Sequence, residues 1–228
     1  MGRQIDVDAS LPATHALVFL LVGYHLVGGL WAWAWWDVDA WTAWLGVRPD
    51  VLRADLGGQH DGRLMTGAWW RLWTSVLLHI DALHLLLNVM ALVVLGRLGE
   101  PLVGAGRWLG CFWVGGVTGS VLAFVTGVPM SDGASGGAFA LMTALSVFGW
   151  RLREELSEDD AWILGPLLGG FTAFNLVLGV FIPGVELAAH VGGCAAGAAT
   201  GASWGAQPSR AWWVVVLGSM VVVAYGIG

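Results

Sequence analysis

Long apolar segments alternate with short polar ones along most of this chain. The spacing of the polar breaks predicts seven membrane-spanning helices, because a helix needs about 20 apolar residues to cross the hydrocarbon core of a bilayer. The predicted helices cover approximately residues 14–36, 75–95, 108–126, 134–150, 162–181, 185–204 and 211–227. The pattern therefore predicts an all-α polytopic membrane protein.

The longest polar stretch between two predicted helices is residues 37–72. It contains arginines, aspartates and several tryptophans, so it is too polar to cross a membrane and too aromatic for a plain linker. Short amphipathic pieces that lie in the bilayer interface fit this mixture best. A second charged stretch, residues 151–160, is predicted to be a solvated connector.

Composition agrees with the pattern of apolar segments. Hydrophobic residues make up 57% of the 228 residues and charged residues 11%, and the mean hydropathy is +0.73. These values exclude an ordinary soluble domain. The chain has no lysine and a net charge of −6, which excludes a nucleic-acid-binding surface. Cys111 and Cys194 lie in apolar segments, where we expect packing and no disulfide, and we predict no cofactor and no metal site.

Arginines in the short loops predict the orientation. With seven spans, the side of the N-terminus receives Arg3, Arg97, Arg107, Arg151, Arg153 and Arg210. By the positive-inside rule this side is the cytoplasm. The arginines of residues 37–72 break the simple count, and an interfacial position beside aspartates accounts for the exception. The first apolar segment has no small-residue cleavage site after a short apolar region, so we predict a retained anchor.

A serine surrounded by small residues stands where a polar turn meets the fourth apolar segment, in Gly133-Ala134-Ser135-Gly136. Ser135 is therefore predicted at a helix start, where unpaired N–H groups and the helix dipole can stabilise an anion. Such small-residue runs also serve as packing surfaces between helices, and by itself this motif favours packing. A nucleophilic role requires a base elsewhere in the chain.

The sixth apolar segment supplies a candidate base, His190, followed by glycines at every fourth position: Gly193, Gly197 and Gly201. This glycine repeat allows another helix to approach backbone to backbone. With His190 as base, the hydroxyl of Ser135 can become a nucleophile. Glu186, one turn earlier, is the nearest candidate to orient the imidazole, although its place at the helix mouth favours a solvated carboxylate.

The second apolar segment carries His84 and Asn88 one turn apart, on one face of the predicted helix. Polar groups at membrane depth are expected to face a wet cavity or a partner. Both side chains could donate hydrogen bonds to an oxyanion, beside the backbone N–H of Ser135. The alternative for Asn88 is a hydrogen bond that only joins two helices.

A set of motifs follows in fixed order from Trp70 to about Gly201: Trp70-Arg71, His79, His84, Asn88, Gly99-Glu100, Gly133-Ala134-Ser135-Gly136, Ala189-His190, Gly193 and Gly197. In order and spacing the set resembles the rhomboid intramembrane serine proteases. The combination is highly specific, whereas a lone Gly-x-Ser-Gly is weak evidence.

The resemblance implies a rhomboid-like six-helix catalytic core over residues 14–204, with residues 37–72 as a long interfacial first loop. Residues 1–13 are then a short cytoplasmic N-terminus, and residues 205–228 an additional C-terminal transmembrane helix. The implied chemistry is a dyad of Ser135 and His190 without an acid, in which His84 and Asn88 help to form the oxyanion hole. Structural roles are implied for Trp70, Arg71 and Glu100, which would hold the first loop, and for Gly193 and Gly197.

One position departs from the family pattern. Phe139 stands four residues after the serine, where many members have a tyrosine that stacks on the histidine; stacking remains possible, but a phenolic hydrogen bond does not. Gly133 and Phe139 are candidates for the substrate pocket or for stacking on the histidine. The implied partners are transmembrane segments of other proteins and the lipid bilayer, and the implied location is a prokaryotic cell membrane with the site near the non-cytoplasmic face.

Two alternatives belong to other classes of function. A catalytically silent rhomboid-like scaffold would bind membrane clients or take part in quality control, but such relatives lack the dyad. A small-solute transporter would have polar residues along a path through the membrane, whereas here they gather near one face. The sequence does not indicate an oligomeric state.

Overall fold

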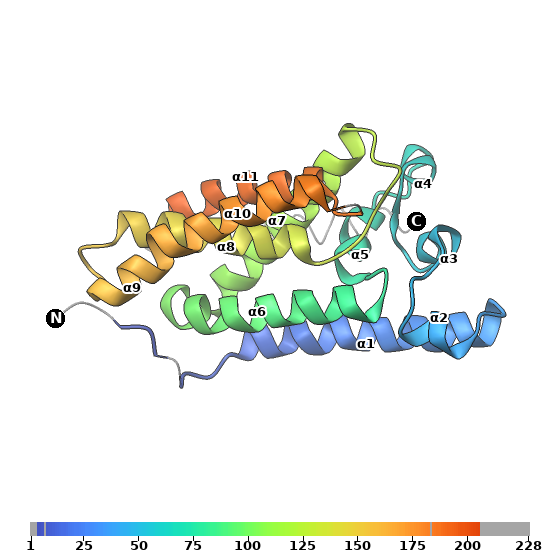
Figure 1. Ribbon diagram of the computed structural model, residues 1–228, viewed down its shortest axis with the longest axis horizontal. Coiled ribbons are helices and arrows are strands. Elements are labelled where there is room, and N and C mark those ends of the chain that lie inside the picture. The colour runs from blue at the N-terminus through green and yellow to red at the C-terminus, as the bar shows by residue number, and fades with distance from the viewer. Residues whose placement is uncertain (1–3, 7, 183, 206–228) are drawn as a thin grey trace.

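A computed structural model of the chain describes residues 4–6, 8–182 and 184–205. Figure 1 shows the long helices α1 and α6 lying alongside each other on one side of the molecule, with α8, α10 and α11 on the other. The long helices and the segments continuous with them are α1 (Pro12–Trp35), α6 (Ala82–Val103), α7 (Ala105–Val125), α8 (Ser135–Arg151), α9 (Glu158–Trp162), the π-helical turn η1 (Ile163–Leu167), α10 (Leu168–Phe181) and α11 (Leu187–Ser203).

Four helices of the described part are long and apolar enough to cross a membrane: α1, α6, α7 and the continuous helix Glu158–Phe181. The helices α8 and α11 have 17 residues each, at the short end of the range for a spanning helix. They form the centre of the molecule with α7, and most of α8 is buried. The predicted helix at residues 211–227 lies outside the described residues.

The second predicted span is displaced along the chain. Instead of one helix over residues 75–95, the structure has a short helix α5 (Arg71–Leu77), a break, and then α6 from Ala82 to Val103. Asp81 starts α6 because its side chain accepts a hydrogen bond from the backbone N of His84 at 2.7 Å. The helix also continues beyond residue 95, through Pro101, and ends at Gly104 with φ +85.

The first loop is a set of short elements packed at one end of the long helices (Figure 1). Its helices are α2 (Ala40–Trp44), α3 (Asp50–Asp55), α4 (Asp61–Met65) and α5, and its strand β1 (Gln59–His60) pairs antiparallel with β2 (Met130–Ser131). Gln59 lies opposite Ser131 and His60 opposite Met130. His60 is half-buried in this strand. The pairing ties the first loop to the segment that precedes α8.

The helix Glu158–Phe181 contains a π-helical turn around Pro166. Proline has no N–H to donate and disturbs the regular helical ladder, which explains the local change of pitch. The carbonyl of Gly165 accepts a hydrogen bond from Ser146 Oγ of α8 at 3.1 Å. A neighbouring helix therefore satisfies a backbone group at this irregular turn.

Candidate active site

Ser135 and His190, which are 55 positions apart in sequence, meet in the structure. The His190 Nε2 atom lies 2.9 Å from Ser135 Oγ. Ser135 is the first residue of α8 and is half-buried, while His190 lies in the first turn of α11 and is 9% exposed. The separation is within the range in which an imidazole can accept the hydroxyl proton.

Close contact between α8 and α11 makes this approach possible. A Cβ atom at Gly193 would lie 2.1 Å from the carbonyl oxygen of Gly136, and one at Gly197 would lie 2.2 Å from that of Ala140. No side chain fits in these gaps, so the two backbones touch. The glycine repeat of α11 therefore sets the distance between the helices that carry the serine and the histidine.

The imidazole of His190 is held by stacking. The ring of Phe139 lies 4.1 Å from it between centroids, with an interplanar angle of 21°. On the other ring nitrogen, Nδ1 has no hydrogen-bond partner among the described residues. Glu186 does not orient the ring, because its carboxylate caps α11 by accepting from the backbone N atoms of Ala188 and Ala189 at 3.0 and 2.9 Å.

His84 and Asn88 lie on the other side of the serine turn. A Cβ atom at Gly133 would lie 2.7 Å from His84 Cε1, so the imidazole packs directly on the turn before Ser135. Asn88 is buried, and its Nδ2 donates to the backbone oxygen of His84 at 2.9 Å. An amide nitrogen carries two hydrogens, so one N–H of Asn88 is left to donate to a developing anion.

His79 contacts the turn that precedes Ser135. The sequence indicated His79 only as a member of the motif set and gave no role for it. Its Nδ1 lies 3.1 Å from the backbone oxygen of Leu77, and its Nε2 accepts from the backbone N of Ala134 at 3.4 Å. A nitrogen that accepts from an N–H carries no proton, so the geometry fits a neutral ring protonated on Nδ1. The His79 ring also meets His84 edge to face at 5.1 Å. His79 thus supports the turn before Ser135.

Trp70 and Arg71 contact the first loop. The Arg71 guanidinium is buried and donates to the backbone oxygens of Ala54 and Gly58, the latter at 3.0 Å. The same guanidinium lies over the ring of Trp70, with 4.4 Å between Arg71 Cζ and the ring centroid. One arginine therefore joins α5 to two points of the first loop.

Glu100 lies elsewhere than expected. Its carboxylate accepts from the backbone N atoms of Ala13 and Thr14 at 2.8 and 2.9 Å, and from Thr14 Oγ1 at 2.6 Å. These donors are the unpaired groups at the start of α1. Glu100 therefore caps α1 and joins α1 to α6, at the end of these helices remote from the first loop. This contact could not be predicted from the sequence, because a cap from another helix leaves no local sequence signal.

The arrangement has the parts required for acyl transfer by a serine nucleophile. A hydroxyl and an acceptor nitrogen are in contact, and the side chains of His84 and Asn88 lie beside the serine turn. Within the described residues there is no group of three or more His, Cys, Asp or Glu side chains that could hold a metal ion.

The known proteins that this chain resembles are rhomboid proteins. The family model of the Rhomboid domain matches residues 66–207, which is more than half of the chain. The chain is 30% identical over 174 residues to rhomboid protease GluP of Bacillus subtilis, covering 75% of this chain and 33% of the relative. It is also 30% identical over 135 residues to putative rhomboid protease YdcA of the same organism, covering 58% of this chain and 65% of the relative.

A plant relative, RHOMBOID-like protein 5 of Arabidopsis thaliana, is 30% identical over 159 residues, covering 67% of this chain and 49% of the relative. The matches therefore span between a third and about two thirds of the length of these relatives.

Proposed function

The chain belongs to the rhomboid family, and from this premise we propose that it is an intramembrane serine endopeptidase that cleaves transmembrane segments of other membrane proteins. One observation carries the proposal: the 2.9 Å contact between His190 Nε2 and Ser135 Oγ, within a membrane protein of this family. In the proposed mechanism these two residues form the catalytic dyad.

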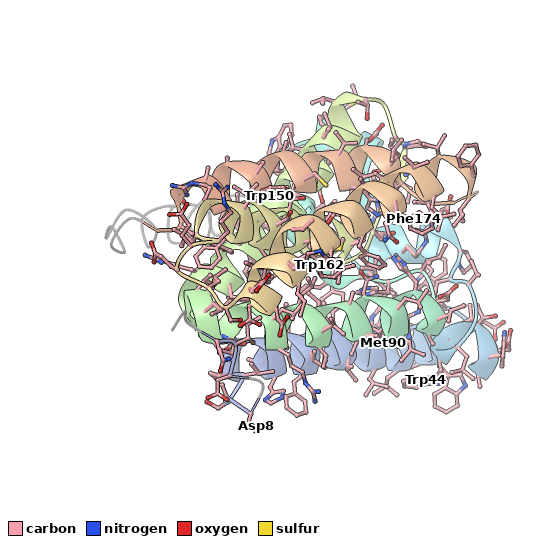
Figure 2. The ribbon with its side chains drawn as sticks, turned by 60° about the vertical axis from the view of Figure 1, so that its left-hand side comes forward. Asp8, Trp44, Met90, Trp150, Trp162 and Phe174 are labelled. Carbon is pink, nitrogen blue, oxygen red and sulfur yellow. The ribbon has the colours of Figure 1, made fainter. Side chains whose placement is uncertain are left out.

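The proposed substrate enters sideways between α6 and α10. Both helices expose large apolar side chains, among them Met90 on α6 and Phe174 on α10. Figure 2 shows these two residues on the same face of the molecule. The end of the substrate helix must unwind before cleavage, because each helical carbonyl is otherwise occupied by the N–H four residues later.

Acylation begins when Ser135 Oγ attacks the exposed carbonyl carbon and His190 Nε2 takes the hydroxyl proton. The carbonyl oxygen becomes an oxyanion, and in this mechanism the backbone N–H of Ser135, Asn88 and His84 donate to it. The C–N bond then breaks, and the proton on His190 Nε2 goes to the departing amine. The carbonyl carbon remains bonded to Ser135 Oγ as an ester.

Deacylation repeats these steps with water. The oxygen of a water molecule attacks the ester carbon while His190 Nε2 takes a proton from that water. His190 Nε2 then gives a proton to Ser135 Oγ as the C–Oγ bond breaks. Phe139 supports both half-reactions by stacking on the imidazole. Water must therefore reach the half-buried Ser135.

We propose that the first loop and Ser135 face the non-cytoplasmic side. In this arrangement the helices α1, α6, α7, α8, α9 to α10, and α11 cross the bilayer as one core over residues 14–204. Residues 1–13 lie in the cytoplasm, and residues 205–228 add a seventh helix. The arginines near the opposite ends of α6, α7 and α8 support this orientation.

The test is cleavage of a reporter transmembrane segment by the purified full chain in bilayers. We expect Ser135→Ala and His190→Ala each to lower kcat by about a thousandfold or more, because either change removes the dyad. Ser203→Ala, a serine on α11 far from the dyad, serves as the matched control and should cleave as the parent does.

Covalent labelling with a fluorophosphonate gives an independent readout. The parent should be labelled and Ser135→Ala should not. A Ser135→Ala variant that still accepts the label, or that still cuts the reporter at the rate of the parent, would rule out this serine as the nucleophile. A parent that binds the reporter segment without cutting it would instead be a scaffold.

A further inference from the structure

A buried ion pair joins the first loop to the turn that precedes Ser135, and the proposed mechanism does not use it. Arg53 of α3 donates from its Nη1 to Asp132 Oδ2 at 2.5 Å. The side chain of Asp132 is 1% exposed and that of Arg53 is 10% exposed. Burial of two charges is costly unless they remain paired, so the pair constrains the distance between the two segments.

The surroundings of Asp132 leave its carboxylate little freedom. A Cβ atom at Gly58 would lie 2.5 Å from Asp132 Oδ1, so the first loop approaches with its bare backbone. Gln59 of the same loop pairs with Ser131, the residue before Asp132, in the two-stranded sheet. The first loop thus holds Asp132 by the Arg53 side chain and holds the preceding residue by backbone pairing.

The position of Asp132 in the chain links this contact to the serine. Gly133 comes next, with φ +129, and its backbone N donates to the oxygen of Ser75 at 2.9 Å. Ala134 follows, and its N–H points at His79. The next N–H is that of Ser135, a donor to the oxyanion in the proposed mechanism. Only two residues, Gly133 and Ala134, therefore separate Asp132 from Ser135, which carries the reacting hydroxyl.

We propose that Arg53 and Asp132 are positioning residues for proteolysis: their ion pair fixes the 132–134 turn so that Ser135 presents its hydroxyl and its backbone N–H to the scissile carbonyl. This inference rests on the proposed function. Neither side chain touches the dyad, so both act through the backbone of the turn. The first loop is then part of the catalytic apparatus as well as a membrane-interface element.

The ionisation of Asp132 makes the constraint on the 132–134 turn depend on pH. Burial raises the pKa of Asp132 to about 7, against the opposing effect of the Arg53 guanidinium. The other charged or titratable groups around it are Asp50 beside Arg53, Tyr24 of α1, Arg71 of α5, and Glu186, which is reached through Ser131. Protonation below neutral pH removes the charge that Arg53 pairs with, and the turn loses that constraint.

The experiment compares Asp132→Asn, Arg53→Gln and the double variant with the parent in the reporter cleavage assay. Each single change breaks the ion pair between the first loop and the turn, although Arg53 keeps Asp50 as a partner in Asp132→Asn. We therefore expect kcat to fall about tenfold and KM to change less than about twofold. The double variant also lacks the pair, so the turn loses the same constraint, and we expect its kcat to be about as low as that of either single variant. An additive fall of about a hundredfold would mean that the two side chains act independently, and would overturn the role of the pair.

The pH profile is the second readout. We expect the ratio of parent to Asp132→Asn kcat to fall from about ten near pH 8 toward one below about pH 6, because protonated Asp132 resembles asparagine. Other titrating groups cancel in this ratio, since both proteins contain them. A ratio that stays constant over this interval would overturn the inference.

The matched control is Asp55→Asn, which breaks the half-exposed Arg63–Asp55 pair of the same loop. It should leave kcat and KM unchanged. If Asp132→Asn and Arg53→Gln also cleave as the parent does while Ser135→Ala is inactive, the positioning role is wrong and the protease proposal stands. If Ser135→Ala cleaves normally, the protease proposal is wrong. If Asp132→Asn, Arg53→Gln and the double variant all fail to fold, the pair is required for folding, and the positioning role is overturned.

Discussion

At the scale of single residues, the proposed mechanism depends on the orientation of one imidazole, that of His190. The Nε2 atom of His190 contacts Ser135 Oγ, and the His190 ring stacks on the face of Phe139. The Nδ1 atom has no hydrogen-bond partner in the part of the chain that the structure describes. A ring held by stacking can still slide in its plane. We therefore expect the proposed dyad to depend on Phe139 more than a triad with a carboxylate would.

Replacing Phe139 tests this dependence. Phe139→Leu keeps an apolar side chain but removes the stacking, which is worth about 0.5–1.5 kcal/mol, so we expect kcat to fall about two- to tenfold. Phe139→Tyr keeps the stacking and should retain the rate. The measurement is steady-state cleavage of the reporter segment.

Phe148→Leu is the matched control for lost aromatic packing. Phe148 lies on the same helix and meets Trp204 edge to face at 6.2 Å, far from the dyad. This variant should lose stability and keep kcat. Equal loss of kcat in both leucine variants would show that Phe139 contributes only to packing.

At the scale of elements, the decisive feature is the contact between α8 and α11. These helices carry the serine and the histidine, and glycines bring their backbones together along the whole interface, from Gly193 to Gly201. Small changes in this spacing move both catalytic candidates at once. We therefore expect stability and activity to be coupled at this interface.

Gly197→Ala should show this coupling. The added methyl would lie 2.2 Å from the backbone oxygen of Ala140, so the helices must separate. Overpacking of this kind costs about 1–3 kcal/mol, and we expect a lower Tm together with a lower kcat. Thermal unfolding in detergent and reporter cleavage measure the two effects.

The control for the glycine substitution is Gly170→Ala in α10, where an added Cβ has no atom within 4 Å. Alanine favours helix over glycine by up to about 1 kcal/mol, so this variant should be as stable as the parent or slightly more stable. A Gly197→Ala protein with parental Tm and kcat would mean that the helices tolerate wider spacing.

At the scale of the whole molecule, the arginines of the first loop no longer contradict the predicted orientation. Arg48 is buried and donates to the backbone oxygens of His25 and Ala43, Arg53 pairs with Asp132, and Arg63 pairs with Asp55. Arg71 donates to backbone carbonyls of the loop. Since the fold engages all four arginines, we expect a first loop on the non-cytoplasmic side to be compatible with them.

Site-directed labelling checks the orientation. In a chain with Cys111 and Cys194 replaced by alanine, we expect a membrane-impermeant maleimide to label Met65→Cys, in the exposed part of the first loop, on intact cells. Glu155→Cys, in the exposed connector after α8, should react only after the membrane is permeabilised. The reverse pattern would place Ser135 on the cytoplasmic side.

The sequence by itself determined which segments are apolar, and the structure has a helix in each predicted span that it describes. The period and length of apolar runs carry this information locally. It also indicated Ser135, His190, His84 and Asn88, because small residues and polar side chains inside apolar segments are rare. The start of α6 was misplaced because the residues before Asp81 are also apolar, and only the cap decides where the helix begins.

Only the tertiary structure decided which distant groups meet. The cap of α1 by Glu100, the support of Ala134 by His79 and the buried pair of Arg53 and Asp132 all join segments far apart in the chain. The physical reason is that such a hydrogen bond or ion pair requires only the right donor and acceptor at one point in space. Such a contact leaves no pattern in the neighbouring sequence. An apolar span or a glycine repeat, in contrast, is a pattern of many residues within one segment, so the sequence shows it directly.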